Sequence, residues 1–543
     1  MNRDRNLRRL AEAAAPWDVL VIGGGATGLG VAVDAATRGY RTALVEQSDF
    51  AKGTSSRSTK LAHGGVRYLR SGEIGLVRGA LRERGLLERN APHLVRRQPF
   101  VIPIYRRLDL PLYGLGLKAY EWLSGRLSFG ASQILSVAET RRLLPTVKPE
   151  GLRGGVLYFD GQFDDARLAL TLARTADAHD TAIVNYACVD GLLKENGRLR
   201  GAVIVDAETG ARHPVAARVV VNATGIFTDE IRRLDEPTVE PMLAVSSGVH
   251  LTLDRSFLPG DHALMIPRTS DGRVLFAVPW QGHVILGTTD EPRAAAELEP
   301  RPLEHEIEFL LEHAAEYLTR PVTRADVQSV FTGLRPLVRA GNSAATASLS
   351  RDHVIAVSPS GLVSITGGKW TSYRKMAEDA VARAAEVGGL PRRPCATENL
   401  RLHGASSAGL RPTDRPPATE AIHFAHYGTD ARALERLAAI EPSLDTPVHP
   451  RLALRAVEVV WAARTEMART IDDVLSRRSR ALQLDARAAL EAAPAVAALF
   501  ARELGRDRRW IDDQLAVFDE IAHGYLAHAK EPAAPHPRAV ANR

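Results

Sequence analysis

The 543-residue sequence predicts an α/β protein with a Rossmann-like dinucleotide-binding domain, a mixed-sheet domain and a C-terminal helical domain. Three observations predict this fold class. A strand, glycine turn, helix and strand follow one another at 17–46, β-rich runs fill 242–350, and an Ala-, Arg-, Leu- and Glu-rich region with helical spacing begins near 395. With 45% hydrophobic residues, the chain is long enough for two or three separate cores.

The first unit has the order expected of a dinucleotide-binding motif. Val19 to Ile22 is too short and β-branched to favour a helix, whereas Ala26 to Arg38 is helical and Arg41 to Val45 forms the next strand. At the end of that strand, Glu46 can accept hydrogen bonds from ribose hydroxyls and disfavours a 2′-phosphate. We therefore expect an adenine dinucleotide here. The tight turn, the close approach to the pyrophosphate and the packing of helix on strand are assigned to Gly23, Gly25 and Gly28.

The residues after Glu46 favour a flavin over a nicotinamide dinucleotide. Instead of another βα unit, the chain continues into 52–68, a segment rich in hydroxyl and amide groups with little hydrophobic periodicity. Such a segment suits a buried polar ligand that needs many hydrogen bonds, although an ordinary surface loop is the alternative. The expected cofactor-binding residues of this segment are Thr54, Ser55, Ser58, Lys60, Leu61 and Gly64.

Further elements complete the first domain. Ala166 to Ala178 has helical periodicity, and Thr181 to Val189 is expected to form a strand. Two more strands, Gly201 to Asp206 and His213 to Val221, predict a hairpin with its turn at 208–210. Small residues at 222–225 then allow the backbone to approach a cofactor. Residues 1–15 are interpreted as a frayed helix rather than a twin-arginine signal.

The remaining chain divides by composition. Strands at Val274 to Val278 and Val284 to Gly287, with a helix near Leu303 to Leu318, indicate a substrate-binding sheet domain. A Gly- and Pro-rich linker at 388–394 precedes the helical region. The expected domains are 17–241 for the cofactor, completed by about 351–385, then 242–350 for the substrate, and 395–530 for the helices.

Several motifs resemble one enzyme family. The run from Ser55 to Leu69, containing His-Gly-Gly-Val-Arg-Tyr, is similar to the signature of FAD-dependent, quinone-linked glycerol-3-phosphate dehydrogenases. The resemblance covers about 17–385 and, more loosely, a helical tail to about 525. Some blocks are shared with flavin amine and hydroxy-acid oxidases, so an FAD-binding domain of that type is implied. Further matching blocks lie at 91–94, 158–168, 221–225, 287–290, 333–337, 350–352 and 367–374.

The resemblance implies oxidation of sn-glycerol 3-phosphate to dihydroxyacetone phosphate. Carbon gives a hydride to the flavin, a base takes the hydroxyl proton, and cations hold the phosphate. Arg335 and Arg351 are the expected phosphate ligands, because guanidinium binds phosphate bidentately. His63 is the preferred base and His250 competes with it. Further contacts to the flavin are expected from Gly225, Gly368, Lys369 and Thr371, with the Lys369 ammonium stabilising the reduced flavin.

Other readings stay open. A glycerol-3-phosphate oxidase would pass the electrons to oxygen, and a related amine or hydroxy-acid oxidase would need a carboxylate-binding Arg and Tyr pair. A flavin-binding protein without activity is disfavoured because Arg335, His63 and Lys369 are all present.

The electron acceptor is expected at a membrane. Cys188 and Cys395 lack iron–sulphur spacing and no metal motif occurs, so electrons must leave the flavin directly for an external acceptor. The resemblance implies that this acceptor is a membrane quinone. Residues 106–126 mix cations with aromatics, which suits peripheral attachment to the cytoplasmic face, although packing inside the protein is the alternative. No run of about 18 apolar residues occurs. A net charge of +6 does not argue for nucleic acid, and a homodimer stays open.

Overall fold

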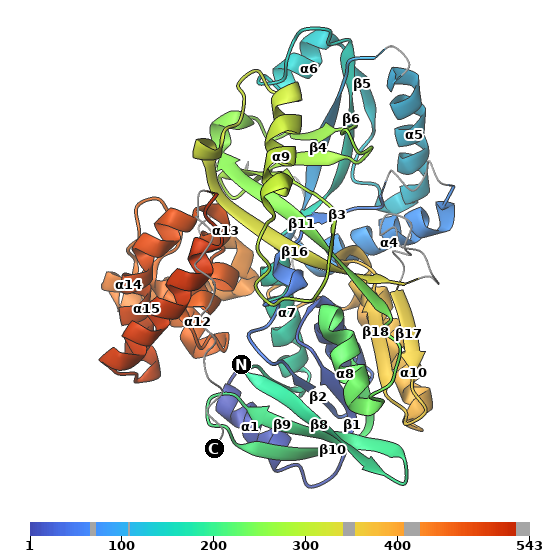
Figure 1. The fold of residues 1–543 in the computed structure, drawn as a ribbon, viewed down its shortest axis with the longest axis vertical. Coiled ribbons are helices and arrows are strands. Elements are labelled where there is room, and N and C mark those ends of the chain that lie inside the picture. Colours follow the sequence, from blue (N-terminus) through green and yellow to red (C-terminus); the bar gives the residue numbers. More distant parts are fainter. Residues whose placement is uncertain (66–71, 107–108, 340–352, 407–423, 528–543) are drawn as a thin grey trace.

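The computed structural model describes residues 1–65, 72–106, 109–339, 353–406 and 424–527. Two β-sheets lie one above the other in Figure 1, and the C-terminal helices pack beside them. This arrangement confirms the predicted α/β class with mixed sheets and a C-terminal helical domain.

The first sheet has a parallel centre. Within the described residues its strand order is β17-β18-β10-β1-β2-β7, and two more strands extend it by antiparallel pairing, β9 with β10 and β8 with β9. Val19, Leu20 and Val21 of β1 are fully buried, as expected of a central strand covered on both faces. The strands are β1 Trp17–Ile22, β2 Thr42–Val45, β7 Ala182–Val184, β8 Ala187–Glu195, β9 Arg198–Asp206, β10 Arg212–Asn222, β17 His353–Val357 and β18 Val363–Gly367.

Four strands of this sheet end at the same edge. β1 pairs in parallel with β2 and β10, and β10 pairs in parallel with β18. Because parallel strands point the same way, their carboxyl ends bring Gly23, Glu46, Gly225 and Gly368 to one edge of the sheet. Open α/β sheets bind their ligands at this edge.

Three helices cover the first sheet. α2 packs against both α7 and α10, and together with β1 they form one apolar core. Gly30 permits the contact with α10, since a Cβ there would lie 3.0 Å from the Tyr373 ring. The bounds are α2 Ala26–Thr37, α7 Asp165–Ala178 and α10 Tyr373–Val387.

The second sheet is mostly antiparallel. Its order is β15-β11-β14-β13-β12-β4-β6-β3, with β16 paired to β11 and β5 to β6. In Figure 1 the long strands β11 and β16 run from this sheet toward the first one. The strands are β3 Leu61–Ala62, β4 Val95–Ile104, β5 Gln133–Leu135, β6 Gly154–Phe163, β11 Leu243–Asp254, β12 Ala263–Ile266, β13 Leu275–Trp280, β14 His283–Gly287, β15 Glu291–Arg293 and β16 Val327–Val338.

The composition of the second sheet corrects the expected division of the chain. The range 17–241 was assigned to the cofactor domain, but β3 to β6, from 61–163, belong to the second sheet. β4 pairs with β12 across about 160 positions of sequence, and such non-local pairing leaves no local signal. The substrate-side sheet is therefore built from two separate segments of the chain.

α8 packs against the first sheet, and the other helices surround the second sheet or form the C-terminal domain. The helical domain packs its apolar core against Trp280, Ile285 and Phe331 of the second sheet. A π-helical turn, Asp473–Arg478, lies within it. The bounds are α4 Ile74–Asn90, α5 Asp109–Ser124, α6 Val137–Leu143, α8 Thr228–Asp235, α9 Glu304–Tyr317, α11 Ala431–Ile440, α12 Ala456–Thr465, α13 Ala481–Leu484, α14 Ala486–Leu504 and α15 Arg508–His523.

Two local predictions were wrong, for one shared reason. The strand expected at Thr181 to Val189 is split into β7 and β8 at Tyr186, whose φ is +52°. The N-terminal helix, α1 Arg3–Ala11, is docked rather than frayed: Arg3 is 5% exposed and donates to the carbonyls of Asn185 and Tyr186. Arg3 also forms a 2.5 Å ion pair with Asp206. The break between the strands thus supplies the acceptors that hold α1.

Arg3→Met should lower the free energy of unfolding by about 3 kcal/mol, because it leaves the buried Asp206 without its cation. Urea denaturation, followed by far-UV circular dichroism, measures this loss. Arg8→Met, at an exposed position of the same helix, is the control and should change stability by less than about 0.5 kcal/mol. Equal effects of the two substitutions would contradict the docking role of Arg3.

Candidate functional site

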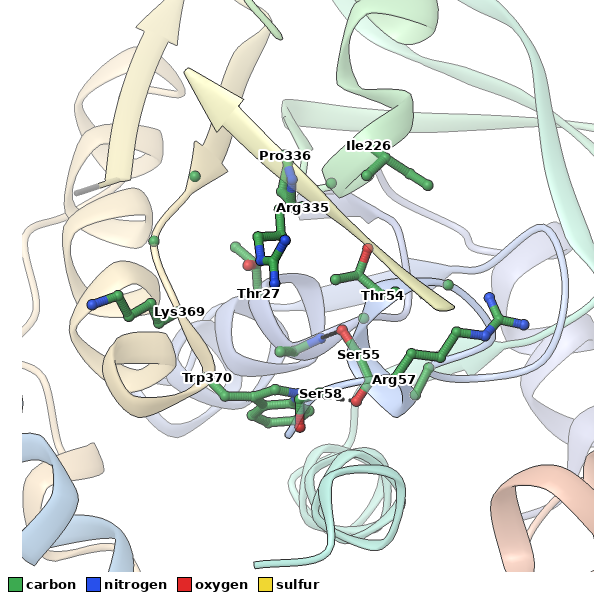
Figure 2. Close-up of a pocket in the computed structure, with 18 of the residues that line it drawn as sticks. Thr27, Thr54, Ser55, Arg57, Ser58, Ile226, Arg335, Pro336, Lys369 and Trp370 are labelled. Carbon is green, nitrogen blue, oxygen red and sulfur yellow. Dashed lines mark hydrogen bonds between the residues drawn. The ribbon is translucent and has the colours of Figure 1, made fainter. Parts of the chain in front are cut away.

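A cavity of about 720 Å³ lies at the carboxyl edge of the first sheet. Its wall combines residues of that edge, such as Gly23 and Gly225, with His250 and Arg335 of the second sheet. Figure 2 shows Arg335 reaching from β16 between Lys369 and Trp370 on one side and Thr54 to Ser58 on the other. The site is therefore shared by both sheets.

The glycine turn has no room for side chains. Gly23 has a φ of +111°, and a Cβ on Gly28 would lie 1.9 Å from the Gly23 carbonyl oxygen. At Gly25 a Cβ would lie 2.9 Å from Ser55 Oγ. The Ser55 hydroxyl in turn accepts a 2.9 Å hydrogen bond from the Ala26 amide, at the start of α2. This turn thus presents backbone amides at a helix N-terminus, which suits a pyrophosphate.

Glu46 lies beside the turn, as expected. Its carboxylate accepts hydrogen bonds from the amides of Gly24 at 2.6 Å and Ser48 at 2.9 Å, and it lines the cavity. Burial raises the pKa of Glu46, and these two hydrogen bonds oppose that shift. Each carboxylate oxygen keeps a further lone pair, so a ribose hydroxyl can still bind.

The segment after β2 forms one wall. Thr54, Ser55, Ser58 and Leu61 all line the cavity. Thr54 Oγ1 donates to the Leu334 carbonyl at 2.6 Å, which ties this wall to β16. The predicted placement of these four residues at the cavity therefore agrees with the structure.

Lys60 and Gly64 are not among the described residues that line the cavity, and their expected contacts to the cofactor stay predictions. Lys60 is fully buried, with Nζ donating to Asp165 at 2.8 Å and to the Ser56 carbonyl at 2.8 Å. Burial lowers the pKa of Lys60 to about 7. The Gly64 amide donates to the Tyr120 hydroxyl at 2.7 Å. Both residues therefore pack behind the residues that line the cavity. The composition of the segment does not indicate which way each residue points.

The other wall comes from the turns after β10 and β18. Gly225 and Gly368, with φ of +59° and +70°, line the cavity together with Lys369 and Thr371. Lys369 directly precedes a 3₁₀ turn that leads into α10, so it stands at a helix start as expected. Thr371 Oγ1 accepts a 3.2 Å hydrogen bond from the His63 amide, which joins this wall to the opposite one.

Arg335 is held by the strands around it. Its guanidinium donates to the carbonyls of Ser247 and Thr289, both at 2.8 Å, and lies 3.3 Å from Asp290. It is 26% exposed at its side chain and lines the cavity. A Cβ on Gly248 would lie 2.3 Å from this guanidinium, so only glycine leaves the space that Arg335 occupies. The arginine is thus oriented in advance toward the cavity.

Both candidate histidines line the cavity. His250 is 3% exposed, stacks on Phe331 with ring centroids 4.7 Å apart, and shares a 2.8 Å hydrogen bond between Nε2 and Thr59 Oγ1. Burial, with the charges of Lys60 and Arg335, lowers the pKa of His250 well below its usual value of 6.5. His250 is therefore neutral at physiological pH, and the same shift weakens it as a base. The structure brings it and His63 to one site.

Arg351, the second expected phosphate ligand, lies outside the described residues. Other lining residues were missed by the sequence analysis: Thr59 and Thr288, which contact His250 and Arg335, and Trp370, whose Nε1 donates to the Ser55 carbonyl at 2.9 Å. All three lie inside the sequence blocks that resemble the family, and these blocks were the signal that could have identified them. An apolar part of the wall also comes together through sheet pairing, and only its Tyr158 lies in a matched block; the other residues are Phe100, Met265 and Phe276.

The cavity fits a flavin dinucleotide. The space at Gly25, at the N-terminus of α2, suits the pyrophosphate, and Glu46 suits a ribose. Hydroxyl groups and a cation at the other turns suit the polar edge of a flavin ring.

Comparisons with known proteins agree with this cavity. A family model described as FAD dependent oxidoreductase matches residues 18–374, and a model described as the C-terminal domain of alpha-glycerophosphate oxidase matches residues 395–510. The probable mitochondrial glycerol-3-phosphate dehydrogenase of Caenorhabditis elegans is 43% identical over 512 residues, covering 90% of this chain and 71% of that protein. The mitochondrial glycerol-3-phosphate dehydrogenase of Rattus norvegicus is 41% identical, covering 93% of this chain and 72% of that protein.

A solved structure is similar over nearly the whole chain. It is the glycerol-3-phosphate dehydrogenase from Bacillus halodurans complexed with FAD, with a TM-score of 0.79 and 30% identity, covering 96% of this chain and 97% of that one. These similarities, together with the cavity, show that the chain belongs to the family of FAD-dependent oxidoreductases.

Proposed function

We propose that this protein oxidises sn-glycerol 3-phosphate to dihydroxyacetone phosphate with FAD as its cofactor, and passes the electrons to a membrane quinone. The relatives named as glycerol-3-phosphate dehydrogenases support the reaction. The main structural support for this reaction is that the Arg335 guanidinium, held by two carbonyls, lines the same cavity as two histidines. A phosphorylated secondary alcohol needs both kinds of group.

Each residue has a role that follows from its chemistry. Arg335 binds the phosphate, since its guanidinium is already oriented by two carbonyls. His63 or His250 accepts the hydroxyl proton; the lowered pKa of His250 keeps its imidazole neutral but weakens it as a base. Lys369 places a positive charge beside the cofactor. FAD, when bound, supplies the hydride acceptor.

Anaerobic mixing of the flavin-loaded protein with sn-glycerol 3-phosphate tests the reaction. Bleaching of the flavin band by this compound, and not by amino acids, is the expected result. Reduction by an amino acid alone would overturn the proposal in favour of an amine oxidase. A second assay compares oxygen with a soluble quinone analogue as acceptor, and faster reoxidation by oxygen would favour the oxidase alternative.

Gly25→Val should abolish FAD binding, because the added side chain fills the space beside Ser55 where the pyrophosphate approaches. The ratio of absorbance at the flavin band to that at the protein band measures the loss in the purified variant. Gly191→Val, at a strand position with open space around it, should keep its flavin. A full complement of FAD in Gly25→Val would contradict the assignment of this turn.

Arg335→Ala should keep FAD but lower kcat/KM for sn-glycerol 3-phosphate about a hundredfold, since a charge-assisted bidentate contact contributes about 3 kcal/mol. Steady-state kinetics with a quinone analogue measure the effect. The matched control is Arg339→Ala, an exposed arginine at the end of the same strand, which should keep activity near that of the unchanged protein. Unchanged kinetics in Arg335→Ala would place the phosphate elsewhere.

The membrane part of the proposal rests on α5. Its inner face packs in the protein, with Tyr113, Leu117 and Tyr120 buried, but Leu115 and Trp122 are 74% and 81% exposed. These two side chains are seven positions apart and so share one helix face. No described helix is long and apolar enough to span a bilayer. We therefore propose peripheral attachment through this face, on the cytoplasmic side, with a homodimer left as an expectation.

A variant carrying both Leu115→Ser and Trp122→Ser should lose most of its co-sedimentation with vesicles of anionic lipid, because it removes the apolar anchor. The control is Ile440→Ser, which removes an equally exposed apolar residue from the helical domain and should leave binding unchanged. Raised salt should weaken binding of the unchanged protein. If all three proteins sediment equally, α5 is not the attachment site.

A further inference from the structure

The cavity wall formed by residues 49–60, here called the wall segment, has little regular structure of its own. It contains one 3₁₀ turn, Thr54–Ser56, and no strand. Yet it supplies Lys52, Thr54, Ser55 and Ser58 to the cavity. A segment without a backbone ladder depends on side-chain contacts for its position. Many of these contacts come from the C-terminal helical domain.

The first contact is at Asp49, which is fully buried. Arg477 Nε donates to Asp49 Oδ2 at 2.6 Å, and Arg478 forms a bidentate pair with both carboxylate oxygens. Both arginines belong to the π-helical turn Asp473–Arg478, which places neighbouring guanidiniums against one carboxylate. Asp49 lies three positions after Glu46, so it marks the point where the chain leaves the first sheet.

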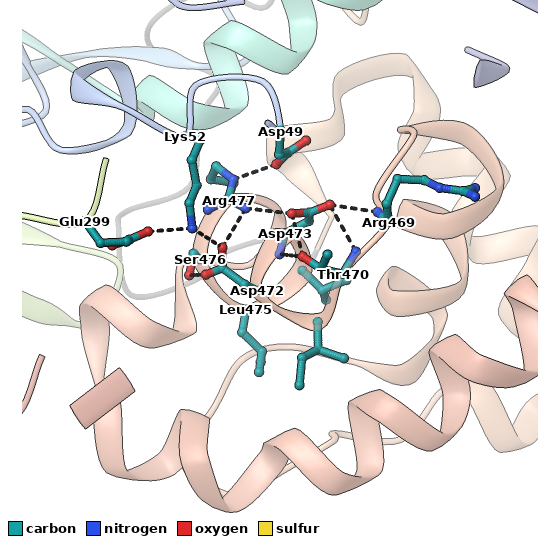
Figure 3. Close-up of polar contacts among 12 residues, drawn as sticks. Asp49, Lys52, Glu299, Arg469, Thr470, Asp472, Asp473, Leu475, Ser476 and Arg477 are labelled. Atoms are coloured by element: carbon teal, nitrogen blue, oxygen red, sulfur yellow. Dashed lines mark hydrogen bonds and ion pairs between the residues drawn. The ribbon is translucent and has the colours of Figure 1, made fainter. Parts of the chain in front are cut away.

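The second contact is at Lys52. Its ammonium lies 2.6 Å from Asp472 in the helical domain and 2.5 Å from Glu299 in the loop before α9. Figure 3 shows Lys52 between these carboxylates, with Arg477 between Asp49, Asp472 and Asp473. One continuous charged network therefore joins the helical domain to the wall segment.

The third contact is to the backbone of the wall segment. The Ser56 carbonyl accepts hydrogen bonds from Arg480 at 2.6 Å and from Gln483 Nε2 at 2.9 Å. Arg480 also pairs with Asp165 at 3.0 Å, and Asp165 holds the amide and hydroxyl of Ser58. These contacts lie on the side of the segment that faces away from the cavity, because Arg480, Gln483 and Asp165 are not among the described lining residues.

Most charges of this network are buried and paired with an opposite charge. Burial alone would raise the pKa of Asp49, but Arg478 and Arg477 hold it below its usual value. Removing one partner leaves a buried charge without compensation, which is strongly unfavourable. Bidentate charge-assisted hydrogen bonds of this kind add geometric specificity, so they fix the position of the loop.

We propose that Arg477 and Arg478 are positioning residues for the cofactor site: acting through Asp49, they hold the wall segment in the conformation that binds FAD. The C-terminal helical domain then sets the affinity for FAD without touching it. This inference rests on the cofactor of the family and is independent of the proposed substrate.

The test measures FAD affinity in the full chain by flavin fluorescence during titration of protein freed of cofactor. Arg478→Met and Asp49→Asn should each weaken FAD binding by at least about tenfold. The double variant should be no weaker than Asp49→Asn, because that change already removes the carboxylate that Arg478 pairs with. Arg478→Lys, which keeps the charge, should recover part of the affinity. The control is Phe500→Leu, which loosens the core of the helical domain without touching the wall segment.

Two outcomes would overturn the proposal. One is unchanged FAD affinity in Asp49→Asn, an isosteric change that decides the matter even if Arg478→Met fails to fold. The other is equal weakening by Phe500→Leu, because general loss of stability would then explain every result. Retention of FAD affinity in Phe500→Leu, despite a lower melting temperature, separates positioning from stability. Substrate turnover does not enter this measurement, so failure of the proposed reaction would not affect it.

Discussion

The parallel pairing of β1 with β2 and β10 is the constraint on which the rest of the structure depends. It fixes the direction of the strands, and so it gathers the turns that follow them at one edge. Gly23, Glu46 and Gly225 meet there only because their strands share that direction. The turn after β18 joins them through the pairing of β18 with β10. A change of register in this sheet would separate the groups that bind the cofactor.

The second sheet reaches this edge because glycines let its strands approach. Gly248 pairs with Gly333 across β11 and β16, and each makes room for a polar group: the guanidinium of Arg335 and the carbonyl of Arg57. The result places a cation on the second sheet beside a cofactor site on the first. The helical domain then holds the wall segment, residues 49–60, through buried ion pairs. The arrangement of the cavity therefore depends on the first sheet, the second sheet and the helical domain, each with its own apolar core.

Local sequence motifs predicted which residues lie at the cofactor site. The pairing of strands far apart in the sequence could not be predicted from such motifs. Gly25, Glu46 and Arg335 were predicted from motifs, since each has a fixed place relative to a strand. The motif of Lys60 does not tell which way its side chain points, and the structure shows it buried against Asp165. The range 61–163 was assigned to the cofactor domain, but its strands belong to the second sheet, because pairing partners far apart in sequence leave no periodic signal.

The most direct test of the account is a crystal structure of the FAD-loaded protein with dihydroxyacetone phosphate bound. The account predicts phosphate oxygens within hydrogen-bond distance of the Arg335 guanidinium, and the carbonyl carbon between the flavin and His63 or His250. A phosphate bound by Lys52 or Arg57 instead, without contact to Arg335, would contradict it.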